Sequence, residues 1–387
     1  MSRHFDVIVV GVGTMGAATC WMLARRGVRV LGLERWGIPN HHGSHHGQSR
    51  VIRKAYSEHP DYVPLLERAY ENWALIEAEA DATLMHRVGG VYMGRPDSEI
   101  IAGSIASMQQ HHLPHEQWTR QDLAQRYPVF QVPDEFIALH DPDAGFILPE
   151  RAVAAFAGEA MRRGGELHGH EPVTGWSADA HGVTVTTAVG RYHADRVVFC
   201  GGAWSGRLLR ALAREPDADA RLPTLTVTRQ IMGWVWPPNP EPFRYGRLPV
   251  WLIDDGWGGP HYGLPMMPDR PGLKLALHRP AEETDPDRLE RQALPGDEAT
   301  FRPILEKYLP DADGPLLSIE ACLYTSSPDG HFILDRHPHH DRVVIACGFS
   351  GHGFKFASVI GEALADLATQ GASDLPIDFL AMRRLSP

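Results

Sequence analysis

Residues 6–35 read DVIVVGVGTMGAATCWMLARRGVRVLGLER. The apolar run at 7–10 predicts a buried strand, and Gly11, Gly13 and Gly16 follow it in a G-x-G-x-x-G turn. A helical segment rich in Ala and Leu comes next, and a second predicted strand at 28–33 ends at Glu34. An adenine-dinucleotide site needs this order of elements, so the stretch predicts an α/β fold that begins with a Rossmann-like unit.

Each glycine of this motif, and the acid after it, has a physical reason. Gly11 permits the tight turn, Gly13 lets the backbone approach a pyrophosphate, and Gly16 lets the helix pack on the strand. Glu34 can accept hydrogen bonds from a ribose, and an acidic residue here disfavours the 2′-phosphate of NADP. The pattern does not distinguish FAD from NAD.

The composition is that of an ordinary globular protein. The chain has 387 residues, of which 43% are hydrophobic and 22% charged. Its length suggests about two to three domain-sized units. A formal net charge of -11 repels phosphate backbones, so we expect no nucleic-acid partner.

The cysteines and the apolar runs indicate the cellular compartment and the relation of the chain to a membrane. No C-x-x-C spacing occurs, which disfavours both a zinc site and a disulfide framework and favours a reducing cytoplasm. The apolar start runs straight into a glycine turn and so differs from a signal peptide. No run reaches about 18 apolar residues, and we expect no membrane span. The four cysteines are Cys20, Cys200, Cys322 and Cys347.

A loop rich in histidine and arginine follows Glu34. Its two His-His pairs invite a metal-site interpretation, but they lie in a Gly-rich loop without helical i, i+4 spacing, so we expect no metal and favour a loop wrapped on a cofactor. Arg50 and Arg53 lie three apart where a helical pattern starts, and could project into one cavity. Exposed surface arginines are the alternative. The histidines are His41, His42, His45 and His46.

Two predicted strands carry further candidates. Residues 319–325 alternate as in a half-buried strand, and on local grounds Cys322 is typical of a small buried hydrophobe. In LKLALH, residues 273–278, the alternation places Lys274 and His278 on one face and the leucines on the other. That face either lines a cavity or is an exposed polar surface.

Four more segments resemble a known family. They are GSHHGQSRVIRKAY (43–56), ADRVVFCGGAWSGRLL (194–209), EACLYTSSPDGHFILDRHP (320–338) and VVIACGFSGHGFKFASVIGEALADL (343–367). Together with GVGTMG at 11–16 they resemble the monomeric sarcosine oxidase and N-methyltryptophan oxidase family, which are D-amino-acid-oxidase-like FAD-dependent amine oxidases. The resemblance covers essentially the whole chain and is weakest around 95–140 and 235–260.

The resemblance implies an activity. The chain would be an FAD-dependent oxidase of N-methyl amino acids, first of all sarcosine, passing a hydride equivalent to flavin N5 and then electrons to O2 to give hydrogen peroxide. N-methyl-L-tryptophan and L-pipecolate are alternatives, because the weakly matched regions would form the side-chain pocket. Two other classes are an NAD-dependent dehydrogenase, disfavoured by Cys322 and GFSGHGFK, and a non-catalytic flavin or amine binder, disfavoured by Arg53, Lys274 and Lys355. We expect a monomer.

The resemblance also assigns residues. Cys322 would carry FAD through a thioether, which would raise the flavin's reduction potential. Arg53 and Lys355 would bind the substrate carboxylate, and Lys274 would activate oxygen. The remaining catalytic positions would be Arg50, Tyr262 and His278. The flavin-contacting positions would be Gly11, Gly13, Gly16, Glu34, Ser44, Ser49, Arg50, Gly202, Cys322, Gly348, Gly351, Gly353 and Lys355.

The flavin-related segments are not contiguous. We expect a discontinuous FAD-binding domain formed by 1–85, 145–215 and 320–387. The intervening segments, 86–144 and 216–319, would form a substrate domain with a second, mostly antiparallel sheet. Ligands would bind between the two.

Overall fold

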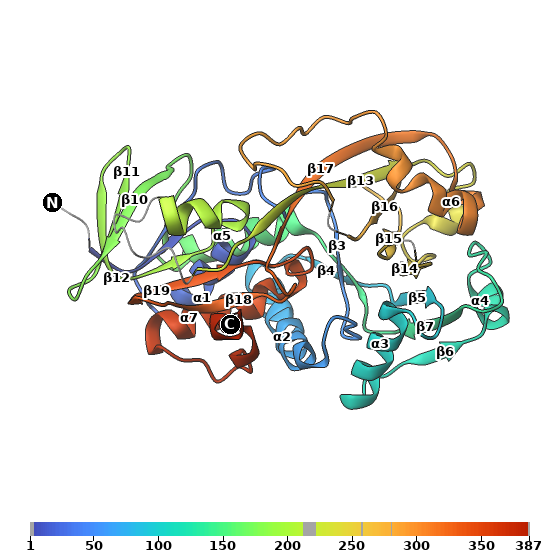
Figure 1. Cartoon of the computed structure of the whole chain (residues 1–387), viewed down its shortest axis with the longest axis horizontal. Coiled ribbons are helices and arrows are strands. Elements are labelled where there is room, and N and C mark those ends of the chain that lie inside the picture. Colours follow the sequence, from blue (N-terminus) through green and yellow to red (C-terminus); the bar gives the residue numbers. More distant parts are fainter. Residues whose placement is uncertain (1–3, 212–221, 257, 280, 386–387) are drawn as a thin grey trace.

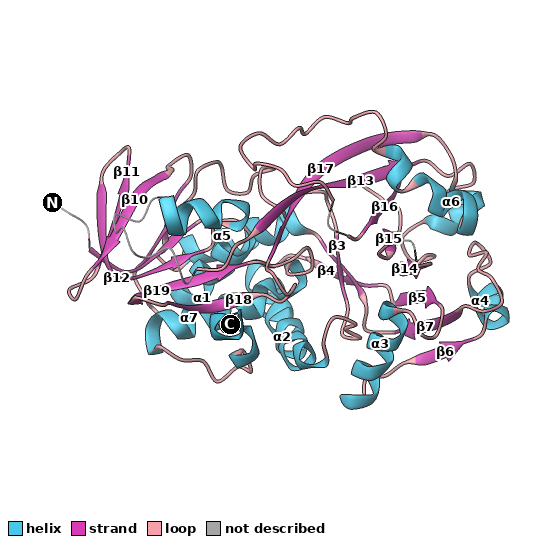
Figure 2. Ribbon diagram, viewed as in Figure 1, coloured by secondary structure: helices cyan, strands magenta, loops and turns pink. Residues whose placement is uncertain are grey.

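Two large sheets lie next to each other along the long axis of the molecule (Figure 1). The computed structural model describes residues 4–211, 222–256, 258–279 and 281–385. Within these residues the chain has a mixed α/β fold (Figure 2). The domain boundary expected at 215–216 and the outermost residues of the chain lie outside the described residues.

The first sheet has the predicted Rossmann-like start. Its first strand pairs in parallel with the strand after the first helix and with a strand from the middle of the chain. These strands end in continuous buried runs, which explains why the sequence reads VIVV there and does not alternate. In order, the strands are β10 (Val173–Ala178), β11 (Val183–Thr187), β12 (Arg191–Phe199), β1 (His4–Val10), β2 (Val30–Leu33) and β9 (Glu166–His168), with β19 (His340–Cys347) beside β12 and β18 (Ile333–His337) beside β19.

Helix α1 (Thr14–Arg25) begins directly after the glycine turn and contacts both α5 (Pro149–Arg162) and α7 (Ala357–Gln370). A Cβ at Gly361 of α7 would lie 2.6 Å from the backbone of Ala18, so the two helices cross at very close range. Helix α2 (Val63–Ala80) packs against α5 and α7 in turn. This packing fixes the start of α1, and with it the glycine turn, at the end of β1.

The second sheet is mostly antiparallel, with one parallel pair between β14 and β5. Helices α3 (Glu99–Gln110), α4 (Arg120–Arg126) and α6 (Arg302–Tyr308) lie on its side of the molecule (Figure 1). In order, the strands are β17 (Leu316–Ser326), β13 (Thr226–Val235), β16 (Leu273–Leu277), β15 (His261–Leu264), β14 (Val250–Asp254), β5 (Gly90–Gly94), β7 (Ile137–Asp141) and β6 (Glu116–Trp118).

A small sheet of three short strands carries the end of the histidine and arginine loop. It consists of β3 (Arg50–Ile52), β8 (Gly145–Ile147) and β4 (Met85–Arg87). The expected helical start around Arg50 and Arg53 is therefore wrong. Arg50 begins a strand whose backbone pairs with β8, and Arg53 follows the last residue of that strand.

The strands of the first sheet all fall within the segments 1–85, 145–215 and 320–387. β17 crosses the expected boundary at 320, because it starts at Leu316 and pairs along its length with β13 of the second sheet. The division into two domains stays a prediction. Among the described residues, no helix combines the length and apolar composition needed to cross a bilayer.

Candidate active site

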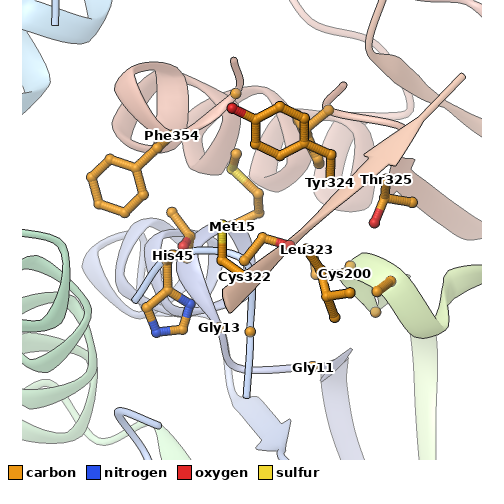
Figure 3. A pocket seen from close by; sticks show the side chains of 18 of the residues that line it. Gly11, Gly13, Met15, His45, Cys200, Cys322, Leu323, Tyr324, Thr325 and Phe354 are labelled. Carbon is orange, nitrogen blue, oxygen red and sulfur yellow. The ribbon is translucent and has the colours of Figure 1, made fainter. Parts of the chain in front are cut away.

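A cavity of about 610 Å³ is lined by residues from both large sheets. Residues 322–325 of β17 pass along it, close to Gly11, Gly13 and His45 (Figure 3). Of the candidate residues, the cavity wall includes Gly11, Gly13, Glu34, Ser44, Arg50, Arg53, Gly202, Tyr262, His278, Cys322, Gly348, Gly351, Gly353 and Lys355.

The glycine turn forms one end of the cavity. A Cβ at Gly11, where φ is +90°, would lie 2.5 Å from the carbonyl oxygen of Cys200, and a Cβ at Gly16 would lie 1.8 Å from that of Gly11. No side chain fits at either position. Gly13 differs, because its Cβ would meet nothing closer than His45 at 3.9 Å. Its bare backbone therefore faces the cavity, as close approach to a pyrophosphate requires.

Glu34 directly follows β2 and lines the same end. Its Oε2 accepts a hydrogen bond from the Val12 amide at 2.9 Å, and its Oε1 accepts one from the Trp36 amide at 3.0 Å. Burial raises the pKa of Glu34, while these two amides lower it. The carboxylate is thus tied to the glycine turn and held where a ribose would lie.

A segment from the second half of the chain closes this end from outside. Asp287 accepts hydrogen bonds from Arg35 Nη1 at 2.7 Å, from Trp204 Nε1 at 2.9 Å and from Arg207. All three donors belong to residues that line the cavity. The Trp36 ring packs edge-on against Trp204 with the ring centroids 4.6 Å apart. One carboxylate therefore joins Arg35, next to Glu34, to the segment that carries Trp204 and Arg207.

The Arg50 guanidinium holds the loop before β3 through the backbone carbonyls of that loop. Arg50 donates hydrogen bonds from Nη1 to the Ser49 carbonyl at 2.9 Å and from Nη2 to the Ser44 carbonyl at 3.0 Å, and it also contacts the His46 carbonyl. Burial lowers the pKa of both His45 and His46 to about 4, so these rings are neutral at neutral pH. No cluster of three or more metal-ligating side chains occurs in the described part of the chain.

Lys274 lies behind this loop. Its Nζ donates to the carbonyls of Gly47 at 2.5 Å and Ser49 at 2.6 Å, and the side chain is 2% exposed. The described residues that line the cavity do not include Lys274, Ser49 or Gly16. The alternation of LKLALH did not reveal this arrangement, because β16 is buried on both faces.

Cys322 is buried on β17 and lines the cavity. It packs with Met232, Trp234 and Ala276 on the second sheet. Burial raises the pKa of the Cys322 thiol, and the charges of Arg50 and Lys274 lower it. The Cys322 thiol therefore lies at the cavity wall, where the charges of Arg50 and Lys274 partly offset the effect of burial.

Arg53 and Lys355 meet at the far end of the cavity. Both cations lie over the ring of Tyr56, each 5.0 Å from its centroid. Arg53 Nη2 donates to Glu58 Oε2 at 2.8 Å. Burial lowers the pKa of Lys355 to about 7, with the charge of Glu58 acting in the opposite direction. This corner combines two cations, one carboxylate and an aromatic floor.

Neutral polar side chains complete that end. His278 Nδ1 lies 2.8 Å from the hydroxyl of Tyr324, and burial lowers the pKa of His278 to about 4. Tyr262 pairs across strands with Leu252, and Leu252 pairs with Tyr92. These three residues therefore form a row on one face of the second sheet.

The three glycines after β19 also line the cavity. A Cβ at Gly351, where φ is +81°, would lie 2.4 Å from the Tyr324 ring, and one at Gly353 would lie 2.6 Å from Phe349. Gly348, at φ +64°, and Gly202, at φ +52°, turn the chain where it meets the cavity. A side chain at Gly351 or Gly353 would thus collide with the aromatic rings of Tyr324 or Phe349.

Comparison with known proteins agrees with this arrangement. The family model described as FAD dependent oxidoreductase matches residues 6–367. The chain belongs to this FAD-dependent oxidoreductase family.

Within it, the chain is 40% identical over 390 residues to a monomeric sarcosine oxidase of Streptomyces avermitilis, covering 100% of this chain and 99% of the relative. It is 34% identical over 387 residues to an N-methyl-L-tryptophan oxidase of Salmonella arizonae, with 99% of each chain covered. Among solved structures it matches NikD, described as an unusual amino acid oxidase essential for nikkomycin biosynthesis, with a TM-score of 0.86, 26% identity and coverage of 98% and 97%.

The cavity fits the cofactor that the family name implies. The buried atoms His45 Nε2 and Thr325 Oγ1 have no hydrogen-bond partner among the described residues, and both residues line the cavity. Buried polar atoms without partners are costly, so a ligand with hydrogen-bonding edges is expected there. Together with Gly13 and Glu34, these atoms suit FAD. The family membership favours FAD over NAD and an oxidoreductase over a non-catalytic binder.

Sequence reasoning missed several residues at this site. Glu58 was hidden because nothing in its local sequence indicates that it pairs with Arg53. Asp287 lies 252 residues from Arg35 in the chain, so no local sequence pattern connects the two. Tyr324 is different, because the alternation of residues 319–325 already places it on the strand face of Cys322, and both residues line the cavity.

Proposed function

We propose that the chain is an FAD-dependent oxidase of N-methyl amino acids, with sarcosine as the first candidate substrate. The reaction would convert sarcosine, O2 and water to glycine, formaldehyde and hydrogen peroxide. The observation that carries this proposal is one cavity with a dinucleotide end at Gly13 and Glu34 and a cationic end at Arg53 and Lys355. Similarity to the sarcosine oxidase of Streptomyces avermitilis supports it.

In this proposal Arg53 and Lys355 hold the substrate carboxylate. Charge-assisted hydrogen bonds are strong in such a buried place, and the fixed cations orient the neighbouring carbon and nitrogen. Arg53 is already engaged by Glu58, so the substrate carboxylate competes with a carboxylate of the protein. When bound, FAD supplies the acceptor for the hydride equivalent and the route of the electrons to dioxygen.

His278, Tyr324 and Tyr262 form the wall beside the amine. Because the pKa of His278 is lowered to about 4, this ring is neutral at working pH and does not repel the ammonium form of a secondary amino acid. The tyrosines are neutral as well, since burial raises the pKa of Tyr262 to about 12 and that of Tyr324 further. These residues orient the amine and exclude water.

We further propose that FAD is attached to Cys322 as a thioether. Burial raises the pKa of this thiol, and the charges of Arg50 and Lys274 partly offset that effect. The proposed oxygen-activating residue is Lys274. Burial and the charge of Arg50 lower the pKa of Lys274 well below its ordinary value, and the charges of Glu150 and Cys322 act in the opposite direction. Arg50 would contribute positive charge beside the flavin. The other predicted flavin contacts, including Ser44, Ser49 and Gly202, belong to the same proposal.

A second candidate substrate carries a larger apolar group than sarcosine. Ile100 and Leu252 line the cavity and come from the two regions where the resemblance is weakest, so an apolar wall faces the substrate end. N-methyl-L-tryptophan or L-pipecolate would place apolar carbon against such a wall. The four cysteines are all free, which supports a reducing cytoplasm, and we propose a monomer, as the relatives' name says of them.

The proposal is tested by oxygen consumption and peroxide release with sarcosine, N-methyl-L-tryptophan and L-pipecolate. At least one should give one peroxide for each oxygen consumed, and sarcosine should also give formaldehyde. The Arg53→Ala protein is the matched control and should need a much higher substrate concentration. Flavin-containing protein that consumes no oxygen with any of the three would contradict the proposal.

A further inference from the structure

The proposed reaction does not use the charged residue Glu150. This residue nevertheless contacts the loop before β3 directly, at Gly47 and Gln48. It lies in the first turn of α5, on the first-sheet side of the molecule. Its Oε1 accepts hydrogen bonds from the backbone amides of Gly47 at 2.9 Å and Gln48 at 3.1 Å. These are the two residues of the loop that adopt positive φ, +107° and +74°.

Positive φ at Gln48 is unusual, because a residue with a side chain is strained in that region. Such a conformation persists where its surroundings hold it. Here two side chains do so, one that accepts hydrogen bonds and one that donates them. Glu150 binds the N–H groups of Gly47 and Gln48, while Lys274 binds the C=O groups of Gly47 and Ser49.

The held loop presents Arg50 to the cavity. Ser49 shares its carbonyl between Lys274 and Arg50, so a shift of this carbonyl would move the Arg50 guanidinium. Burial raises the pKa of Glu150, but the loop amides and the charge of Arg50 outweigh burial and leave the pKa below its usual value. Glu150 therefore stays ionised beside the Arg50 guanidinium.

We infer that Glu150 is a positioning residue that holds the loop 47–49 from the side opposite to Lys274 and thereby places Arg50 against the cofactor. This inference rests on the proposed function only for its effect on rate. The geometric part concerns the chain itself and can be tested without turnover. Substrate binding should be unaffected, because Arg53 and Lys355 are held by other contacts.

The test compares Glu150→Ala and Glu150→Gln with wild type, as FAD-loaded proteins. Glu159→Gln is the matched control, since Glu159 lies on the same helix and its carboxylate accepts hydrogen bonds from Arg162. Hydrogen exchange of the peptide covering residues 44–50, followed by mass spectrometry, should be about tenfold faster in Glu150→Ala. Glu150→Gln should recover part of the protection, because an amide oxygen still accepts hydrogen bonds.

A second readout follows anaerobic flavin reduction by substrate. The limiting rate should fall about tenfold in Glu150→Ala and less in Glu150→Gln, with the substrate dissociation constant unchanged. Unchanged exchange in both Glu150 variants would overturn the inference. Faster exchange with no reduction by any secondary amino acid, even in wild type, would leave the positioning role standing and contradict the proposed function instead. If Glu150→Ala does not fold, Glu150→Gln decides alone.

Discussion

Arg53 and Glu58 form an ion pair inside the cavity, with Arg53 Nη2 2.8 Å from Glu58 Oε2 and Arg53 only 4% exposed. The residue proposed to bind the substrate carboxylate is thus already bound to a carboxylate of its own chain. Burial raises the pKa of Glu58, but the charge of Arg53 lowers it well below its usual range, so the pair stays ionised at all working pH values. Any anionic substrate must compete with Glu58.

Glu58→Gln should therefore strengthen carboxylate binding. At pH 6, where Lys355 of the wild type is protonated and Arg53 is charged in both proteins, we expect the dissociation constant of a simple carboxylate such as acetate to fall by about fivefold in the variant. The spectral change of bound flavin on titration measures it. Glu71→Gln, at the surface on α2, is the control. Weaker binding in Glu58→Gln would show that Glu58 supports Arg53 and does not compete.

Substrate affinity should fall as the pH rises through about 7. Burial lowers the pKa of Lys355 to about 7, so the side chain is charged below that pH and binds a carboxylate, and it is neutral above. The apparent KM measured from pH 6 to 8.5 should rise. Lys355→Met should have a high KM that varies little with pH. A wild-type KM that stays constant over this range would contradict the assignment.

Cys322→Ala should release the flavin on acid precipitation. In wild type, a covalent thioether would keep the yellow colour in the pellet, whereas the variant should leave a colourless pellet and a yellow supernatant. The expected gain in reduction potential from the linkage also predicts slower flavin reduction in the variant. Retention of covalent flavin without Cys322 would place the attachment elsewhere.

Lys274→Met separates two roles of one buried side chain, oxygen activation and the holding of the loop 47–49. If Lys274 activates oxygen, reoxidation of reduced flavin should slow by about a hundredfold or more, far beyond any effect on anaerobic reduction. Stopped-flow mixing with oxygen and, separately, with substrate measures the two rates. Equal slowing of both would indicate that Lys274 acts only through the carbonyls of Gly47 and Ser49.

Asp287→Asn should loosen the closure over the dinucleotide end. The carboxylate joins Arg35, Trp204 and Arg207, and an amide would bind the two arginines more weakly. In the Cys322→Ala background, where FAD is free to leave, its dissociation should be about fivefold faster. Glu282→Gln, with the same charge change in the same segment, is the control. Equal dissociation rates would show that this ion cluster does not retain the cofactor.

Sequence patterns predict those features that depend on residues close together in the chain. The glycine turn follows from local sterics, and Gly11 and Gly16 have no room for a Cβ, as the motif requires. The strand at Cys322 followed from its alternation. The strand at Arg50 could not be predicted from the local pattern, because it forms by pairing with β8, more than 90 residues away in the chain.

The pairings of the charged side chains were the least predictable part of the site. Glu150 and Asp287 bind groups more than 100 residues away in the chain, and Glu58 pairs with Arg53 through an irregular segment that has no periodic pattern. Lys274 was expected on a cavity face, yet its strand is buried on both sides and its ammonium ends on loop carbonyls. Sequence alternation gives the face of a strand, but it cannot say what covers that face.

The central claim is that the cavity holds FAD at one end and oxidises a secondary amino acid held by Arg53 and Lys355 at the other. The most direct test mixes purified protein anaerobically with sarcosine, N-methyl-L-tryptophan or L-pipecolate and follows the flavin absorbance. We predict that at least one of them bleaches the flavin, and that Arg53→Ala needs at least about tenfold more of that substrate for half-maximal rate. A yellow protein that none of the three bleaches would contradict the account.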